Sequence, residues 1–266
     1  MSDEANSKEK SAQGEGLMDT LRVILQALAL AAVVHICLYQ PFTIPSGSMI
    51  PTLLVGDYLF VSKFSYGYSR YSLPFRPNLF EGRLFGSEPE RGDVAVFKLP
   101  RDNKTDYIKR VIGLPGDRIQ MKAGLLYIND QAVEQERIDD FVGPGSTCNM
   151  GQREISVPRY LETLPNGVKH DILDCSAISG SRVQSDGDNT EVFVVPAGHY
   201  FMMGDNRDNS TDSRFGGYNG VGFVPFENFV GRADIIFFST DETASWFAPW
   251  RWPFEIRWTR FFELIR

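Results

Sequence analysis

Two serines separated by one glycine are the first residues of this chain whose types and spacing could do chemistry. They lie in the segment IPSGSMIP, residues 44–51, with a proline near each end. Prolines restrict the backbone, so a hydroxyl group in this segment can be presented on a constrained turn. A serine hydroxyl is a weak nucleophile unless a base removes its proton. The segment therefore predicts a nucleophilic serine only if another part of the chain supplies that base.

Histidine is the usual base for a serine nucleophile, and the chain has three histidines. His35 lies in an apolar run, His170 lies in a stretch of weak periodicity, and only His199 precedes a polar loop. A histidine-dependent triad is therefore the weaker possibility.

A lysine can act as the base if removal from water lowers the pKa of its amine. In the segment DYIKRVIG, residues 106–113, strand alternation places Lys109 on one face with Tyr107 and Val111, and turns Arg110 to the other face. On a buried face Lys109 could serve as the base. On an exposed edge strand it would be an ordinary solvated lysine, and spacing alone does not decide between the two.

A third polar segment is GDNRDNSTDSR, residues 204–214, which follows an apolar strand pattern. Its Asp and Asn content suggests a calcium loop, but the EF-hand spacing fails because a ligand position falls on Arg207. We expect its charges to be paired, Asp212 with Arg214 or Arg110, and the Ser210 hydroxyl could orient an amine. A simple solvated turn is the alternative for this loop taken alone.

These segments together resemble the bacterial type I signal peptidases, which are membrane-bound endopeptidases that remove signal peptides with a Ser/Lys pair. The resemblance rests on five blocks in order along the chain: SGSMIPT at 46–52, GDY at 56–58, RGDV at 91–94, DYIKR with GLPGD at 106–117, and GDNRDNSTDSR at 204–214. It covers about residues 44–130 and 190–240, and leaves both tails and the stretch between without a clear match.

The resemblance implies a role for each matching residue. Ser48 matches the nucleophile and Lys109 the general base, while the Ser46 hydroxyl and the Ser48 backbone N–H match the oxyanion donors. Ser210 matches the serine that positions the lysine, and Asp212 and Arg214 match residues that support the loop, to which we add Arg110. The resemblance also implies cleavage after small residues, in apolar pockets for which the candidates are Ile44, Met49, Leu53 and Val111. The Ser/Lys chemistry needs no cofactor, and three cysteines and three histidines without a C-x-x-C pair leave little with which to build a metal site.

The elements that must position these residues begin with an apolar run from Leu21 to Tyr39. Its length is close to the about 20 residues that span a bilayer, so we expect a transmembrane helix over 21–40 in preference to a core helix or a cleaved signal peptide. Lys8, Lys10 and Arg22 lie on its N-terminal side, whereas the next basic residue is Lys63. The positive-inside rule then predicts a single-pass protein of the bacterial inner membrane, with a cytoplasmic N-terminus and a periplasmic catalytic domain.

The remainder of the chain predicts a mainly β fold. Short runs rich in Val, Ile, Phe and Tyr are separated by Gly, Pro, Asn and Asp, as in strands joined by turns. The expected strands are 58–64, 93–99, 106–113, 118–122, 125–128, 191–195, 199–203 and 229–239, with a hairpin turn at Asn129-Asp130. We therefore expect a disordered cytoplasmic tail over 1–20, a β-rich catalytic core over 41–132 and 188–240, an irregular inserted lobe over 133–187, and an aromatic membrane-proximal segment over 241–266.

Cysteines and aromatic residues add two further expectations. Cys148 and Cys175 lie in the predicted lobe and could form a disulfide in an oxidising periplasm, with two free thiols as the alternative. Aromatic residues alternate with arginines over 64–85, and all four tryptophans lie at positions 246 to 258. Rings beside arginines suit a lipid headgroup layer, but they could equally complete the core or a lid. We favour membrane contact for the C-terminal stretch and leave the earlier one open.

Composition excludes several other functions. A chain of 266 residues with a formal net charge of −7 lacks the basic footprint of a nucleic-acid-binding protein. A self-cleaving repressor of the Ser/Lys type would need an Ala-Gly bond before the serine, whereas both such pairs follow Ser48.

A membrane-tethered binding module remains the alternative from another class, and catalytic activity would separate this alternative from a peptidase. The expected partners are secretory preproteins and the lipid bilayer, with the protein acting as a monomer.

Overall fold

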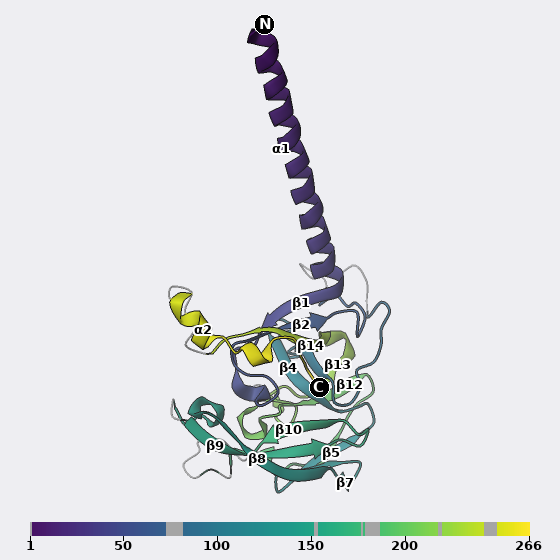
Figure 1. Ribbon diagram of the computed structural model, residues 1–266. Helices are drawn as coiled ribbons and strands as arrows, with labels where there is room; N and C mark the ends of the chain where they lie inside the picture. The colour runs from purple at the N-terminus through teal and green to yellow at the C-terminus, as the bar shows by residue number, and fades with distance from the viewer. Residues whose placement is uncertain are drawn as a thin grey trace.

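The computed structural model describes residues 2–72, 82–151, 154–176, 178, 187–217, 220–241 and 249–266. A long helix projects from a body built almost entirely of β-sheet (Figure 1). The mainly β fold expected from the sequence is therefore confirmed.

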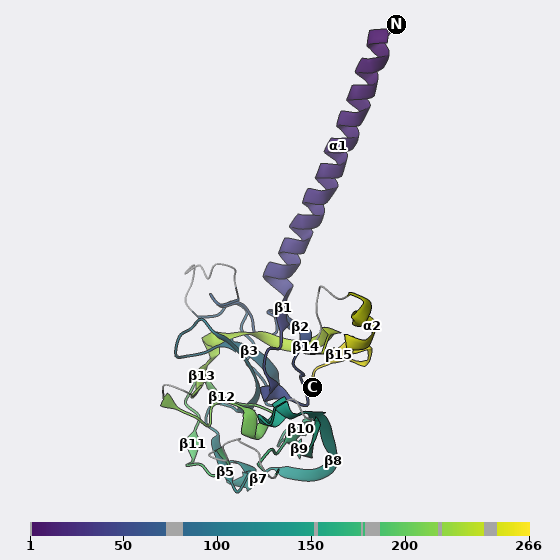
Figure 2. The same cartoon turned by 90° about the vertical axis from the view of Figure 1, so that its left-hand side faces the viewer.

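The N-terminal helix α1 extends from Ser2 to Val33 and is followed by a π-helical turn, Val34–Leu38. Strand β1, Tyr39–Thr43, then joins the body, and Figure 2 shows the helix leading away from it. The helix continues through residues expected to be disordered, a stretch rich in the helix formers Ala, Glu, Lys and Gln.

The predicted transmembrane helix over 21–40 is not confirmed. In the part of the chain that the structure describes, no helix is both long enough and apolar enough to cross a membrane.

The largest sheet carries the body and has eight strands. Its order is β1, β2 (Asp57–Ser62), β14 (Phe229–Ser239), β3 (Val94–Lys98), β4 (Asp106–Gly113), β12 (His199–Met203) and β13 (Val224–Pro225), with β15 (Glu263–Leu264) also paired to β14. All of these pairs are antiparallel. The strands expected over 106–113, 199–203 and 229–239 are found with those bounds.

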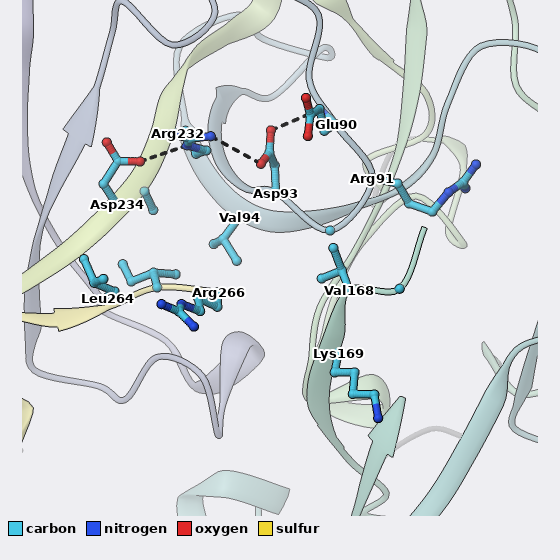
Figure 3. Close-up of a pocket in the computed structure, with 14 residues that line it drawn as sticks. Glu90, Arg91, Asp93, Val94, Val168, Lys169, Arg232, Asp234, Leu264 and Arg266 are labelled. Carbon is cyan, nitrogen blue, oxygen red and sulfur yellow. Dashed lines mark hydrogen bonds and ion pairs between the residues drawn. The ribbon is translucent and has the colours of Figure 1, made fainter. Parts of the chain in front are cut away.

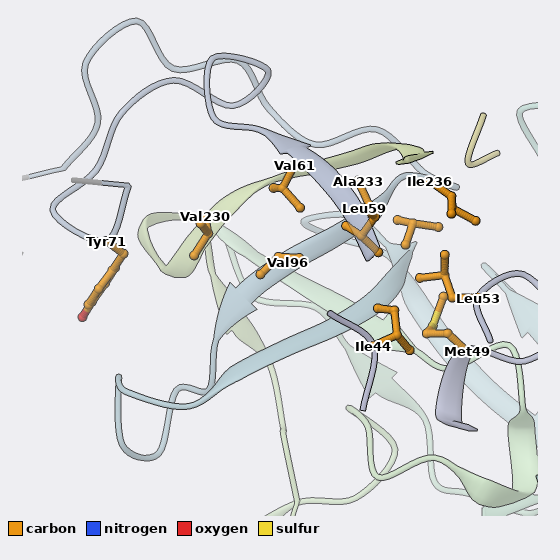
Figure 4. Packing of buried hydrophobic residues seen from close by; sticks show 11 residues of the cluster. Ile44, Met49, Leu53, Leu59, Val61, Tyr71, Val96, Val230, Ala233 and Ile236 are labelled. Carbon is orange, nitrogen blue, oxygen red and sulfur yellow. The ribbon is translucent and has the colours of Figure 1, made fainter. Parts of the chain in front are cut away.

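Hydrophobic clusters explain why these segments form a sheet. One cluster joins Leu59 and Val61 of β2, Val96 of β3 and Ala233 of β14, all of them fully or nearly fully buried (Figure 4). Strand alternation sends every second side chain of each strand into such a layer. The residue that follows the nucleophile candidate, Met49, packs in this same cluster, so the turn carrying Ser48 is anchored on the core.

A second sheet of four strands lies beside the largest one. It consists of β5 (Arg118–Lys122), β6 (Leu125–Ile128), β7 (Gln131–Ala132) and β11 (Phe193–Val194). The turn predicted at Asn129-Asp130 joins β6 to β7, and both turn residues have positive φ, 52° and 64°. Such angles suit the tight hairpin turns that Asn and Asp favour.

The region expected to be irregular forms a third antiparallel sheet instead. Its strands are β8 (Glu134–Pro144), β9 (Glu154–Thr163) and β10 (Lys169–Leu173). The irregular structure expected there is therefore not found, while the extent of the inserted lobe stays a prediction. β8 exposes most of its side chains, so its sequence has no apolar alternation that would have indicated a strand. Pairing with β9, and of β9 with β10, defines these strands. This sheet is called the lobe sheet below.

The two aromatic segments behave differently. In the first, Tyr66 and Tyr71 are buried in the core, while Phe75, Arg76 and Phe80 lie outside the described residues. The C-terminal segment, residues 249–266, contains the short helix α2 (Trp252–Glu255) and ends in β15. Four of its aromatic side chains are exposed, Trp250, Phe254, Trp258 and Phe262, whereas Trp246 lies outside the described part.

Candidate active site

Ser48 lies at the centre of a short 3-10 turn, Gly47–Met49, immediately after the extended residue Ser46. The turn is closed by the Ile50 N–H, which donates to the Gly47 carbonyl at 3.2 Å, and continues with the Leu53 N–H donating to the Met49 carbonyl at 2.9 Å. Ser48 is buried with 7% of its surface exposed, whereas Ser46 is exposed. The two serines of the motif therefore have different environments.

Lys109 reaches this turn from strand β4. Its Nζ lies 2.6 Å from Ser48 Oγ and donates to the Ile108 carbonyl at 3.0 Å. Lys109 is 3% exposed and sits opposite Ala95 of β3, with β12 pairing on the other side of β4. Of the two environments that the sequence allowed for this lysine, the structure therefore has the buried one.

Burial lowers the pKa of the Lys109 amine to about 8. Desolvation is the largest cause, since an ammonium ion loses its hydration inside the protein. The carboxylates of Asp212 and Asp205 oppose this shift and Arg214 adds to it. A neutral amine is therefore available near neutral pH, in direct contact with a serine hydroxyl, which is the arrangement of a nucleophile and its general base.

The rate of catalysis is expected to rise as the pH passes about 8, because only the neutral Lys109 amine can accept the Ser48 proton. Below that pH each unit should lower kcat/KM about tenfold. The measurement is kcat/KM between about pH 6 and about pH 10, with Lys122→Ala as control, since Lys122 is exposed at the end of β5. A rising limb near about 10.4, the ordinary value for lysine, would contradict a desolvated base.

The loop after β12 packs against the nucleophile turn. A Cβ on Gly204 would lie 2.3 Å from Ser210 Oγ and 2.5 Å from the Ser48 carbonyl oxygen, so only glycine fits there. Asp212 accepts from the Gly204 N–H at 3.0 Å and pairs with Arg214 at 2.9 Å. Of the two partners considered for Asp212, the structure has Arg214. Among the described residues, no hydrogen bond joins Ser210 Oγ to Lys109.

Arg110 pairs instead with Asp205, on the opposite face of β4 from Lys109. Two nitrogens of its guanidinium donate to the two Asp205 carboxylate oxygens at 2.9 and 2.7 Å, and a third donates to the Gly92 carbonyl at 2.8 Å. Thr52 Oγ1 also donates to Asp205, at 2.5 Å. The residue next to Lys109 is thus fixed to the loop after β12 and, through Thr52, to the segment that follows Ser48.

Comparison with known proteins shows the family to which this chain belongs. The family model described as signal peptidase, peptidase S26, matches residues 17–238. The signal peptidase I of Rickettsia prowazekii is 45% identical over 218 residues, 81% of this chain and 78% of that protein, and the one of Rickettsia typhi is 46% identical with the same coverage. The chain belongs to the signal peptidase family.

A signal peptidase I from Enterococcus faecalis of known structure is 25% identical, with a TM-score of 0.31, over 55% of this chain and 97% of that one. The family blocks in the sequence and the two Rickettsia relatives agree in identifying this peptidase as a serine hydrolase.

Asn206 is a site residue to which the sequence analysis assigned no role. Its N–H donates to the Ser48 carbonyl at 3.2 Å, and its side-chain amide donates to the carbonyls of Gly47 at 3.1 Å and Thr147 at 2.8 Å. One side chain thus holds the nucleophile turn against the 3-10 turn Gly145–Cys148, which lies between β8 and β9 of the lobe sheet. The only signal in the sequence was the density of Asn and Asp in this loop.

A buried charge cluster, which has no local signal in the sequence, connects the same loop to the lobe sheet. Arg207 pairs with both oxygens of Glu162 on β9, at 2.9 and 2.5 Å, and His170 Nε2 on β10 lies 3.3 Å from Glu162. Burial lowers the pKa of His170, with the Arg110 charge as the next cause, so this histidine is neutral at neutral pH. Cys148 and Cys175 form a disulfide, with their Cα atoms 5.6 Å apart.

The four residues expected to line substrate pockets are core residues in this structure. Ile44, Met49 and Leu53 belong to the cluster of Figure 4, and Val111 belongs to a neighbouring cluster with Tyr66. All four are at most 2% exposed. Their predicted role in lining the substrate pockets stays a prediction.

A cavity of about 640 Å³ opens between β14, the C-terminal residues and the turn before β10 (Figure 3). Neither Ser48 nor Lys109 lines it. Its charges are largely paired, since Arg232 contacts Asp234 at 2.9 Å and Asp93 at 3.8 Å. The cavity is therefore separate from the chemistry of the serine and lysine.

Proposed function

We propose that this peptidase removes signal peptides from secretory preproteins, with Ser48 as nucleophile and Lys109 as general base. The observation that carries the proposal is the 2.6 Å contact between Lys109 Nζ and Ser48 Oγ inside the protein. The lowered pKa of Lys109 supports it, because a lysine that stays charged at neutral pH could not take a proton.

The proposed reaction is acyl transfer in two steps. Neutral Lys109 takes the Ser48 proton as Oγ attacks the scissile carbonyl carbon, and the oxyanion accepts hydrogen bonds from the Ser48 N–H and the Ser46 hydroxyl. The C–N bond then breaks and protonated Lys109 gives its proton to the leaving amine. Water, activated by the regenerated amine, attacks the acyl ester and releases Ser48. Every group in this scheme is supplied by the chain and by water.

The test of this function is cleavage of a purified secretory precursor that has alanine at the first and third positions before the cut. The mature N-terminus should appear at that bond, and Ser48→Ala should give no product. A membrane-tethered binding module would bind the precursor without cutting it.

We further infer that the exposed apolar residues of the N-terminal segment associate the peptidase with a bacterial membrane. Nine large apolar side chains between Leu21 and Leu38 are exposed: Leu21, Val23, Ile24, Leu25, Leu28, Leu30, Val33, Val34 and Leu38. Exposure of so much contiguous apolar surface is unfavourable in water and favourable in lipid. The basic residues before it favour an N-terminus on the cytoplasmic side and a catalytic body on the periplasmic side.

Flotation with phospholipid vesicles measures this association. The double variant Leu25→Asp/Leu28→Asp should lose most vesicle binding, because each leucine that leaves water contributes about 2 kcal/mol. Val142→Asp is the matched control, since Val142 is as exposed as Leu28, at 61%, but lies on the lobe sheet. Equal binding by wild type and the double variant would disprove the role of this segment.

A further inference from the structure

The C-terminal segment, residues 249–266, lies beyond the end of the family match at residue 238 and still contacts the loop that follows the nucleophile. Two arginines make the contact: Arg257 donates to the Val55 carbonyl at 2.8 Å, and Arg260, at the end of a 3-10 turn, Trp258–Arg260, makes the larger set of bonds. Arg260 Nη2 donates to the Thr52 carbonyl at 2.9 Å and to Asp57 Oδ2 at 2.7 Å, and its Nε donates to Asp57 Oδ1 at 3.1 Å. The guanidinium thus binds a backbone carbonyl and a carboxylate of the same loop.

Asp57 is the residue that gives this contact its strength. Its side chain is fully buried and also accepts from the Leu54 N–H at 2.8 Å and from Ser239 Oγ at 2.6 Å. The carboxylate therefore closes the loop between Leu54 and Asp57. A buried carboxylate needs a cation nearby, and Arg260 supplies it at 2.7 Å, while Arg257 lies at 4.0 Å.

Thr52 connects this contact to the catalytic residues. It lies four positions after Ser48, and Arg260 holds its carbonyl from one side while its own hydroxyl donates to Asp205 on the other. Asp205 in turn pairs with Arg110, the neighbour of Lys109 in β4. The segment after the nucleophile is thus held between the C-terminal segment and the strand that carries the base.

The C-terminal segment has anchors that do not depend on Arg260. Strand β15 pairs with β14, and the Phe262 N–H donates to the Ile236 carbonyl at 2.7 Å. The rings of Phe261 and Phe238 are 5.4 Å apart. Removal of the Arg260 guanidinium should therefore leave the segment docked and affect the loop selectively.

We propose that Arg260 is a positioning residue for catalysis: through Thr52 and Asp57 it fixes the loop that follows the nucleophile and so sets the position of Ser48 relative to Lys109. The proposal rests on the proposed function, since it concerns the same serine and lysine. It gives the C-terminal segment a part in the chemistry of the site, 212 positions along the chain from Ser48 (260 − 48).

The test compares Arg260→Ala, Arg260→Lys, Arg266→Ala and Ser48→Ala in the full chain, with cleavage of the alanine-containing precursor as the assay. Arg260→Ala should lower kcat about 10- to 100-fold with little change in KM, because a displacement of about 1 Å can lower a rate that much. Arg260→Lys should recover part of the loss, since it keeps a cation at Asp57. Arg266→Ala, an exposed arginine of the same segment, should match wild type.

The pH profile separates positioning from a general loss of stability. A displaced turn should admit water to Lys109 and so weaken the desolvation that lowers the pKa of its amine. The nearby carboxylates of Asp212 and Asp205 also favour the charged amine, and Arg214 opposes them. The rising limb of Arg260→Ala should accordingly move to higher pH. A parallel unfolding measurement gives the fraction of folded enzyme by which each rate is corrected.

Two results would overturn the inference. In the first, Arg260→Ala has the same corrected kcat and the same rising limb of the pH profile as Arg266→Ala. In the second, Arg260→Lys has a kcat no higher than that of Arg260→Ala, and the rising limbs of both variants are unshifted. In either case Ser48→Ala would still be inactive and the proposed function would stand. An active Ser48→Ala enzyme would instead overturn the proposed function and the inference with it.

Discussion

Replacement of Ser48 or of Lys109 by alanine is expected to lower the cleavage rate by about 10⁶-fold, the scale of loss when the nucleophile or base of a serine peptidase is removed. The two residues act as a unit because Nζ and Oγ are in direct contact at 2.6 Å. The double variant should therefore be no less active than either single one. Lys109→Arg should also be inactive, since a guanidinium does not release its proton at working pH.

Stopped or end-point cleavage of the precursor measures these losses, and circular dichroism shows that each variant is folded. Ser46→Ala provides the comparison within the same motif. Its hydroxyl is the second oxyanion donor of the proposed reaction, so its loss should lower turnover only about 100- to 1,000-fold. Retained turnover in folded Lys109→Ala would show that another group is the base.

Removal of Arg207 is expected to lower the free energy of unfolding by about 3–5 kcal/mol, because it leaves the Glu162 carboxylate buried without its main cation. Glu162→Gln should be destabilising for the converse reason, with Arg207 left unpaired. The double variant Arg207→Met/Glu162→Gln should be more stable than the sum of the two single losses predicts, since no isolated charge remains. Urea unfolding of the four proteins completes the cycle.

The same pair gives a pH dependence of stability whose sign can be worked out. Burial by itself raises the pKa of Glu162, but the charge of Arg207 and the hydrogen bond from His170 outweigh burial and hold the pKa at about 2. A folded pKa below the unfolded value of about 4.3 contributes stability that is present above that value and lost as the pH falls towards about 2. Glu162→Gln should remove this acid-sensitive part, and an unchanged acid limb in that variant would contradict the assignment.

The sequence alone predicts a strand where the residues of that strand carry a strand-forming pattern. Residues 106–113 are rich in the β-branched and aromatic residues that favour strands, and the structure has β4 with those bounds. The turn at Asn129-Asp130 follows from residues that tolerate positive φ. The family blocks likewise identified Ser48 and Lys109 as candidates, because a motif of adjacent residues can be recognised from the sequence without the fold.

The lobe sheet could not be predicted from local pattern. Strand β8 exposes most of its side chains, so its sequence resembles a loop, and only pairing with β9 makes it a strand. Contacts with distant strands outweighed the local composition there. The membrane span predicted from the apolar run is not confirmed in the part of the chain that the structure describes.

The environment of the site was decided by tertiary structure alone. Strand alternation left Lys109 either buried or solvated, and its burial follows from the nucleophile turn and the neighbouring strands that close over β4. The partners Glu162 and Arg207 are 45 positions apart, and Thr52 and Arg260 are 208 apart. The sequence does not indicate which charged residues pair at such separations, because the Coulomb energy and the loss of hydration depend on distance and burial in space.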